Sequence, residues 1–292
     1  MGRSKFRATW VGANFVGFGP LPSERQKVLF VNADDFGFTE DVNEGIIDAH
    51  VRGILTSTTL MANGAAFSDA VRRAKATPTL DVGCHLVLVG GQSLVTKTPL
   101  PKSLSAMMRA VTFGALEPYH EFRAQIKKIL AAGIRPTHLD THKHTHLYPP
   151  VLDAVARLSQ EFSVPWVRRP FDFPLDGQRV PLRRQALSRS LGVFRQSFHS
   201  KLARHGCWTT DHFAGFSLTG HLSIQDLVQI LDQLPEGVTE LMVHPGYCRD
   251  ELRAAPTRLK ESREKELQAL TAVVTRAAIE RNGIQLARYS TR

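Results

Sequence analysis

The chain has 292 residues, 42% of them hydrophobic and 22% charged, which is an ordinary balance for a globular protein. No apolar run reaches the roughly 18 residues that a membrane-spanning helix needs, and the three cysteines have no C-x-x-C spacing, which argues against a transmembrane protein and a disulfide framework. The formal net charge of +10 is spread over short basic groups without interleaved aromatic residues, so we expect no nucleic-acid partner.

The amino-terminal segment differs from the rest of the chain. Within residues 1–26, Arg3, Lys5 and Arg7 precede a mildly apolar stretch that glycines and an asparagine dilute. We therefore expect a poorly ordered leader there rather than a secretory signal. No linker or shift in composition marks a later boundary, so residues 27–292 are predicted to form a single domain. The odd cysteine count favours a reducing compartment, and we expect a cytoplasmic location.

Short apolar runs alternate with helical patterns along the whole domain. The run 27–33 is almost continuously apolar, which is typical of a strand buried on both faces. Further strands are predicted at 54–61, 80–89, 136–142, 164–168, 213–218, 238–244 and 284–288. Helices are predicted at 39–52, 65–76, 117–132, 150–161, 184–205, 224–234 and 261–281. This alternation implies βαβ units with parallel strands, and seven or eight of them predict an α/β fold of (β/α)-barrel type, distorted or incomplete.

The stretch from Thr137 to His146 has the most unusual pattern in the chain. It places side chains able to bind a metal at every second position: His138, Asp140, His142, His144 and His146. Alternate residues of a strand share one face, so the first three point the same way, with the last two at or past the strand end. Imidazoles and a carboxylate on one face suit a divalent cation.

Other candidate groups follow the ends of neighbouring strands. Asp34 and Asp35 come after the first strand, His85 lies in the third, and His244 ends the strand that begins at Val238. Catalytic groups of (β/α) barrels come from the carboxyl ends of several strands, so we expect these residues to converge with His142.

Such a set can hold a divalent ion and still leave positions open for water and substrate. A bound ion lowers the pKa of water toward about 7 in the best zinc sites, a carboxylate can accept the proton, and a histidine can protonate a leaving group. The set could hydrolyse an amide, an ester or a phosphoester. These residues alone leave the bond open.

Six motifs together resemble the YdjC-like carbohydrate deacetylase family, which includes chitooligosaccharide deacetylases and deacetylases associated with hopanoid biosynthesis. They are Asn32-Ala33-Asp34-Asp35-Phe36-Gly37, Gly45-Ile46-Ile47, Ser57-Thr58-Thr59-Leu60-Met61, Gly83-x-His85-Leu86, Pro136-Thr137-His138-Leu139-Asp140-Thr141-His142 and His244-Pro245-Gly246. The resemblance extends from about Val28 to Leu270.

This resemblance implies a barrel-like fold and the removal of an acetyl group from an N-acetylated sugar. It implies one divalent ion bound by Asp35, His85 and His142, with zinc or magnesium expected first and manganese, iron or cobalt as alternatives. Asp34 would be the general base and His244 the general acid. Arg263 matches a family arginine and is expected to orient Asp34, whereas the remaining polar residues of the fourth-strand motif would support the ligands or contact substrate: His138, Asp140, His144 and His146.

Two segments, 90–116 and 170–212, match little of the family pattern. As loops at the barrel mouth they would select the substrate, which is expected to be a small or amphiphilic N-acetylated sugar, chitooligosaccharide-like or lipid-linked. Two alternatives stay open: a metal-dependent phosphoesterase on the same ligands, and a non-catalytic sugar-binding barrel. A homodimer is compatible with the sequence.

Overall fold

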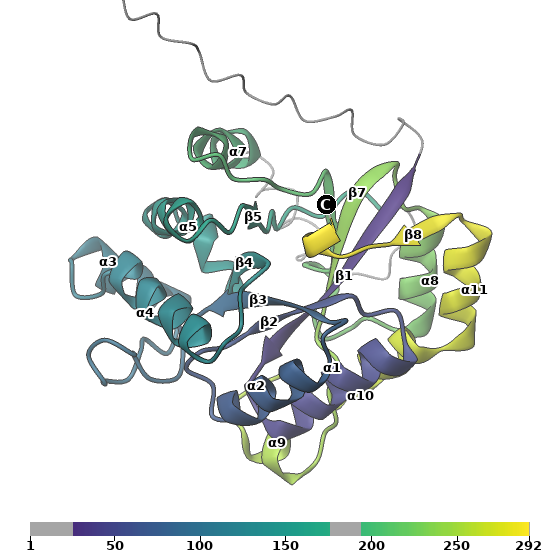
Figure 1. Cartoon of the computed structure of the whole chain (residues 1–292), viewed down its shortest axis with the longest axis horizontal. Helices are drawn as coiled ribbons and strands as arrows, with labels where there is room; N and C mark the ends of the chain where they lie inside the picture. Colours follow the sequence, from purple (N-terminus) through teal and green to yellow (C-terminus); the bar gives the residue numbers. More distant parts are fainter. Residues whose placement is uncertain (1–25, 176–193, 292) are drawn as a thin grey trace, which may run out of the picture.

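A single parallel sheet organises the computed structural model, which describes residues 26–175 and 194–291 (Figure 1). Its strands follow the order β5-β4-β3-β2-β1-β7-β6, and β8 pairs with β1. The bounds are β1 Lys27–Phe36, β2 Ser57–Leu60, β3 Asp81–Leu86, β4 His138–Thr141, β5 Trp166–Val167, β6 His212–Ala214, β7 Gly237–Val243 and β8 Ile284–Leu286. The predicted α/β architecture with parallel strands is confirmed, and the sheet curls into an irregular barrel.

Two irregularities distort the barrel. β5 and β6 are not paired in the sheet, and this gap is closed by a bridge between Trp166 and Trp208, in which the Trp208 amide donates to the Pro165 carbonyl at 2.8 Å and the Val167 amide donates to the Trp208 carbonyl at 2.9 Å. Further along, the Phe173 amide donates to the Phe213 carbonyl at 2.8 Å. On the other side, β7 occupies one edge of β1 from Lys27 to Ala33. The other edge of β1 is therefore shared, by β8 at its start and by β2 further on.

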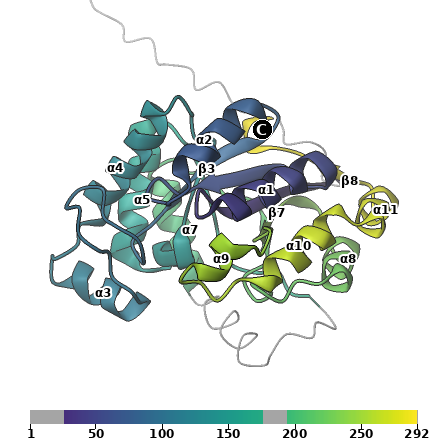
Figure 2. The same cartoon turned by 90° about the horizontal axis from the view of Figure 1, so that it is seen from below.

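Helices surround this sheet, as the second view shows (Figure 2). They are α1 Glu40–Arg52, α2 Phe67–Ala76, α3 Leu104–Thr112, α4 Pro118–Ala131, α5 Pro149–Phe162, α7 Arg195–Arg204, α8 Ile224–Asp232, α9 Asp250–Ala254, α10 Glu261–Thr271 and α11 Val273–Arg281. Within the described ranges, none is long and apolar enough to cross a membrane.

The core lies between the sheet and these helices. Strand β1 is buried from Val28 to Phe36, as its apolar run predicts, and its side chains belong to the main core cluster or to a smaller one around Phe30. Parallel strands covered by helices lose water on both faces, and each buried large apolar side chain contributes about 1.5–3 kcal/mol. The continuous core fixes the carboxyl end of β1, where the two aspartates lie.

Several predicted boundaries differ from the structure. Most strands are shorter than expected, and the single helix predicted over 261–281 is two helices, because Ala272 has an extended ψ of 140°. The Thr275 hydroxyl donates to the Ala269 carbonyl at 2.7 Å across this break. The break lets α11 pack against α8 while α10 packs against α1.

Other predictions fall partly outside the described residues. The helix predicted over 184–205 corresponds to α7 in its described part, and the predicted leader lies outside the described residues except for Gln26. Helices α3 and α9 were not predicted. The assignment of residues 27–292 to one domain stays a prediction.

Gly45 of α1 provides a test of this packing. A β-carbon there would lie 2.5 Å from the Gly246 Cα in the loop after β7. Alanine usually stabilises a helix interior by up to about 1 kcal/mol relative to glycine. We expect the opposite sign for Gly45→Ala, a loss of about 1–3 kcal/mol in the free energy of unfolding, because the backbones must separate.

Urea unfolding measures this change, with Val51→Ala as the matched control on the exposed face of the same helix, where 66% of the residue is accessible. The control should stay within about 0.5 kcal/mol of the parent. A Gly45→Ala variant as stable as the parent would contradict the packing.

Candidate active site

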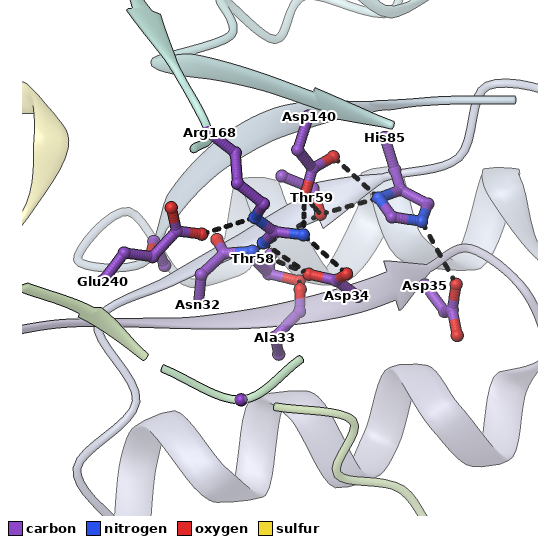
Figure 3. Close-up of polar contacts among 12 residues, drawn as sticks. Asn32, Ala33, Asp34, Asp35, Thr58, Thr59, His85, Asp140, Arg168 and Glu240 are labelled. Carbon is purple, nitrogen blue, oxygen red and sulfur yellow. Dashed lines mark hydrogen bonds and ion pairs between the residues drawn. The ribbon is translucent and has the colours of Figure 1, made fainter. Parts of the chain in front are cut away.

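The carboxyl ends of β1, β3 and β4 bring the predicted residues together. Strand β3 pairs with β4 so that His85 lies opposite Asp140. Asp34 and Asp35 end β1 nearby, and Figure 3 shows both facing the same polar cluster. The convergence expected from the order of the βαβ units is present in the fold.

Asp35, His85 and His142 form a compact group of possible metal ligands. His85 Nε2 lies 3.4 Å from Asp35 Oδ1, His142 Nδ1 lies 3.3 Å from the same oxygen, and the two nitrogens are 3.3 Å apart. Donor atoms at about 2.0–2.1 Å from a tetrahedral ion are themselves about 3.3–3.4 Å apart. Asp35 Oδ1 is buried without a hydrogen-bond partner, a costly state that a cation would relieve.

The backbone separates the two neighbouring aspartates. Asp35 has a φ of 70°, a left-handed conformation that is rare for residues other than glycine, and the pairing of β1 with β2 shifts register between Ala33 and Phe36. Asp34 can therefore face the barrel interior while Asp35 faces His85 and His142. The expectation that the two carboxylates do different work agrees with this geometry.

Polar partners hold the ligand candidate His85 in place. Asp140 Oδ1 lies 2.7 Å from His85 Nδ1, and Thr59 donates its hydroxyl to Asp140 Oδ2 at 3.0 Å. Burial disfavours a charged imidazole, but the Asp140 and Asp35 carboxylates outweigh it and raise the pKa of His85 to about 10. A carboxylate on the far nitrogen fixes the ring's orientation and makes the near nitrogen a stronger metal ligand.

Arg263 lies elsewhere than expected. Its Nη2 donates to Asp35 Oδ2, so it supports the metal-ligand candidate and not Asp34. Despite burial, which disfavours the anion, Arg263 and the two histidines hold the pKa of Asp35 well below its usual value. The predicted pairing of Arg263 with Asp34 is wrong in this structure.

Arg168 takes the place predicted for Arg263. Its guanidinium donates two hydrogen bonds to Asp34, each 2.7 Å long, and also contacts Asp140 at 2.8 Å and Glu240 at 2.6 Å (Figure 3). All four side chains are buried. Burial opposes ionisation of Asp34, but Arg168 lowers the pKa of that carboxyl far below its usual value.

Sequence reasoning missed this arginine and Glu240. In the sequence Arg168 stands beside Arg169 as one of the short basic groups over which the positive charge is spread. The available signal was position, because Arg168 directly follows β5 at the strand end where barrel sites form. Glu240 had a signal too, as a lone carboxylate within the apolar run of β7.

His244 lies on the other side of Asp34. Its Nε2 is 3.9 Å from Asp34 Oδ2, longer than a hydrogen bond, and its backbone amide donates to Glu266 Oε2 at 2.5 Å. Burial lowers the pKa of His244 to about 4, although the nearby Asp34 and Asp35 carboxylates oppose that shift. The imidazole is therefore neutral near pH 7.

The remaining histidines of the fourth-strand motif separate. After β4 the chain turns into the 3-10 segment η1, His142–Leu147, in which Lys143 and His144 have φ of 56° and 51°. The alternation therefore ends at His142. His138 contacts Asn32 Oδ1 at 2.9 Å, and His146 Nε2 lies 3.1 Å from the Arg168 carbonyl oxygen.

A cavity of about 1100 Å³ opens over this site. Its floor includes both aspartates of β1 and the metal-ligand candidates. Its apolar wall comes from Phe38, Met61, Val89, Leu104 and Phe216. The segment 90–116 contributes part of this wall, as its predicted place at the barrel mouth requires. Within 170–212, Asp172 accepts hydrogen bonds from the Phe216 and Ser217 amides and so holds Phe216 at the cavity.

Fold and site together define a (β/α)-barrel protein with an Asp-His-His group at the carboxyl end of its sheet. The chain matches the YdjC-like protein family over residues 28–281 and belongs to that family. The predicted family resemblance is confirmed.

Named relatives agree with the assignment. A carbohydrate deacetylase of Brevibacillus brevis is 35% identical over 90% of this chain and 98% of its own length. A carbohydrate deacetylase of Vibrio parahaemolyticus is 32% identical over 90% of this chain and 95% of its own. A crystal structure of a proposed cellobiose-phosphate cleavage protein from Enterococcus faecalis is 26% identical, with a TM-score of 0.69 over 91% of this chain and 98% of that one.

Asp140 provides a test of the ligand support. Asp140→Asn removes the negative charge behind His85, and we expect metal affinity to fall about 10–100-fold. Competition with a chromophoric chelator measures the affinity. Asp153→Asn is the control, because the Asp153 side chain is 44% exposed and forms an ion pair with Lys201, away from the cavity-lining residues. Equal affinity in the Asp140 and Asp153 variants would show that Asp140 does not support the ligands.

Proposed function

We propose that this protein is a metal-dependent hydrolase that removes the N-acetyl group from an N-acetylated amino sugar. The family and the curated relatives support the enzyme class, a carbohydrate deacetylase. The observation that carries the proposal is a single cavity floor that combines the Asp35, His85 and His142 group with a buried, charged Asp34 and a neutral His244. Each group has a distinct use in amide hydrolysis.

In this proposal Asp35, His85 and His142 hold one divalent ion, which when bound would polarise the acetamide carbonyl and lower the pKa of an attacking water. The 3.3–3.4 Å spacing of the donor atoms supports a tetrahedral ion such as zinc. Adjacent oxygens around octahedral magnesium would be closer, about 2.9 Å apart. Two imidazoles and one carboxylate are also a common donor set for zinc.

Asp34 is the proposed general base. Arg168 keeps it ionised and fixes both of its oxygens, so the carboxylate is charged and oriented before substrate binds. The hydrogen bonds from Arg168 make Asp34 a weaker base, but they also hold its carboxylate in a fixed orientation. His244 is the proposed acid for the departing amine. Because its imidazole is neutral near pH 7, it must first take up the proton released at Asp34, 3.9 Å away.

The size of the cavity suits a substrate larger than one free sugar. Its volume of about 1100 Å³ and its apolar wall suit either the flat faces of a short oligosaccharide or the apolar part of a lipid-linked sugar. Asn63 at the wall donates its amide nitrogen to the Gln92 carbonyl, which leaves its buried amide oxygen to accept a hydrogen bond from a sugar hydroxyl. Relative acetate release from chitooligosaccharides and from alkyl-linked N-acetylglucosamine would decide between these classes.

The contacts of Arg168 argue against the phosphoesterase alternative. Two-metal phosphoesterases place ions about 3.5–4 Å apart. Asp34, His85 and Asp140 form a second group of possible ligands, but the Arg168 guanidinium already bonds both carboxylates. A second cation would have to displace it. One ion per chain by elemental analysis would agree with the deacetylase, and two would favour the phosphoesterase.

The non-catalytic alternative would be favoured by the loss of a ligand or base, yet Asp34, Asp35, His85 and His142 are all present and converge. A cytoplasmic location and a homodimer stay predictions.

Asp34→Asn tests the base directly. Asparagine keeps the shape of the side chain but cannot accept the proton, so we expect acetate release to fall by about 10²–10⁴ while the protein still binds one ion. Acetate is measured by a coupled assay and metal by elemental analysis. Glu161→Gln, which alters a carboxylate that contacts Arg123 on the surface, is the control. Turnover within a few-fold of the parent would refute the base assignment.

A further inference from the structure

The carboxyl-terminal residues fill the amino-terminal end of the barrel. After β8, the Ala287 amide donates to the Leu29 carbonyl at 3.0 Å, and the chain ends in the 3-10 segment η3, Tyr289–Thr291. Figure 1 shows this end, in yellow and marked C, following β8, the strand that pairs with the start of β1. Tyr289 is 4% exposed and contacts Phe30 and Trp166, at centroid distances of 4.5 and 5.7 Å.

The Tyr289 ring stacks on His138. Their centroids are 3.8 Å apart and their planes differ by 15°. Gly83 on the neighbouring strand leaves the space for this imidazole, because a β-carbon at Gly83 would lie 2.6 Å from atoms of the His138 ring. The stack therefore restrains His138 through Tyr289, a residue far from His138 in the sequence.

Hydrogen bonds connect His138 to Asp34, the proposed general base. Its Nε2 lies 2.9 Å from Asn32 Oδ1, and Asn32 Nδ2 donates to Asp34 Oδ1 at 3.1 Å. With the Asn32 oxygen as acceptor, Nε2 carries the proton, and Nδ1 is free to accept from the Thr137 hydroxyl at 2.9 Å. Two hydrogen bonds thus separate the stacked pair from Asp34.

We propose that Tyr289 is a positioning residue for catalysis, which acts through His138 and Asn32 to hold Asp34 in its reactive orientation. The proposal rests on the proposed role of Asp34 as the base. Tyr289 does not line the cavity, so it should affect the rate of the chemical step and not the binding of substrate.

The tail has anchors that do not depend on Tyr289. The Ser290 amide and hydroxyl donate to Asp81 at 2.8 and 2.7 Å, and Arg288 donates to the Thr79 carbonyl at 3.0 Å. Substitution of Tyr289 can thus remove the stack while the backbone stays in place. Ser290→Ala weakens the tail but keeps the ring, which makes it a matched control.

The experiment compares Tyr289→Ala, Tyr289→Phe and Ser290→Ala with the parent. We expect Tyr289→Ala to lower kcat about 10-fold or more with KM changed by less than about 2-fold, because a small displacement of Asp34 slows the chemical step. Metal content should stay at the parent's value. Phenylalanine keeps the stacked ring and should restore most of kcat, and Ser290→Ala should resemble the parent. A thermal melt confirms that each variant is folded at the assay temperature.

Equal kcat in the parent and Tyr289→Ala would overturn the proposal, as would a fall in kcat that phenylalanine does not restore. A parent that releases no acetate would instead refute the proposed function. In that case amide hydrogen exchange tests the positioning role. Peptides covering β1 and β4 should exchange faster in Tyr289→Ala than in Tyr289→Phe, whereas peptides covering α4 should exchange equally in both. Equal exchange in β1 and β4 would overturn the positioning role.

Discussion

The contact of one buried guanidinium with three carboxylates is the constraint on which this site depends. Arg168 follows β5 and bonds Asp34 of β1, Asp140 of β4 and Glu240 of β7, so it connects strands across the barrel interior. Burial of charge is expensive unless every charge is paired, and removal of one partner from such a cluster usually costs about 3–5 kcal/mol. Burial raises the pKa of Glu240 to about 7, which limits the negative charge that one arginine must balance.

A second constraint is the left-handed residue at Asp35. By turning there, β1 gives two adjacent carboxylates separate partners: Arg168 holds Asp34, and Arg263 holds Asp35. In the proposed function Asp34 accepts a proton, and Asp35 leaves an oxygen facing His85 and His142. The strained backbone persists because the buried pairs on both sides restrain it. The proposed division of labour between base and ligand depends on this single turn.

Much of the fold could be predicted from local patterns. The apolar run at 27–33 and the alternation of strands with helices indicate parallel βαβ units, and strand ends are where barrel sites form. Asp35, His85 and His142 could be placed together on that basis, since each lies at or near such an end. The family resemblance then assigned their roles, and the structure brings them within 3.4 Å of one another.

The rest depends on contacts between residues distant in sequence. Residue type does not distinguish Arg168 from the other paired basic residues of the chain, and only the folded barrel shows that it faces three carboxylates. Arg263 could be expected to face an aspartate, but which of two neighbours it contacts is decided by one backbone angle at Asp35. Tyr289 reaches His138 only because β8 inserts beside β1. Sequence periodicity carries no information about such contacts.

The most direct test of this account is acetate release by metal-stripped protein with zinc or magnesium added back, measured on a panel of N-acetylated sugars that includes short chitooligosaccharides and an alkyl-linked amino sugar. The account predicts no release without metal and restoration at one ion per chain, with zinc more effective than magnesium. Release that is unaffected by metal removal, or activity found only on phosphoesters, would contradict it.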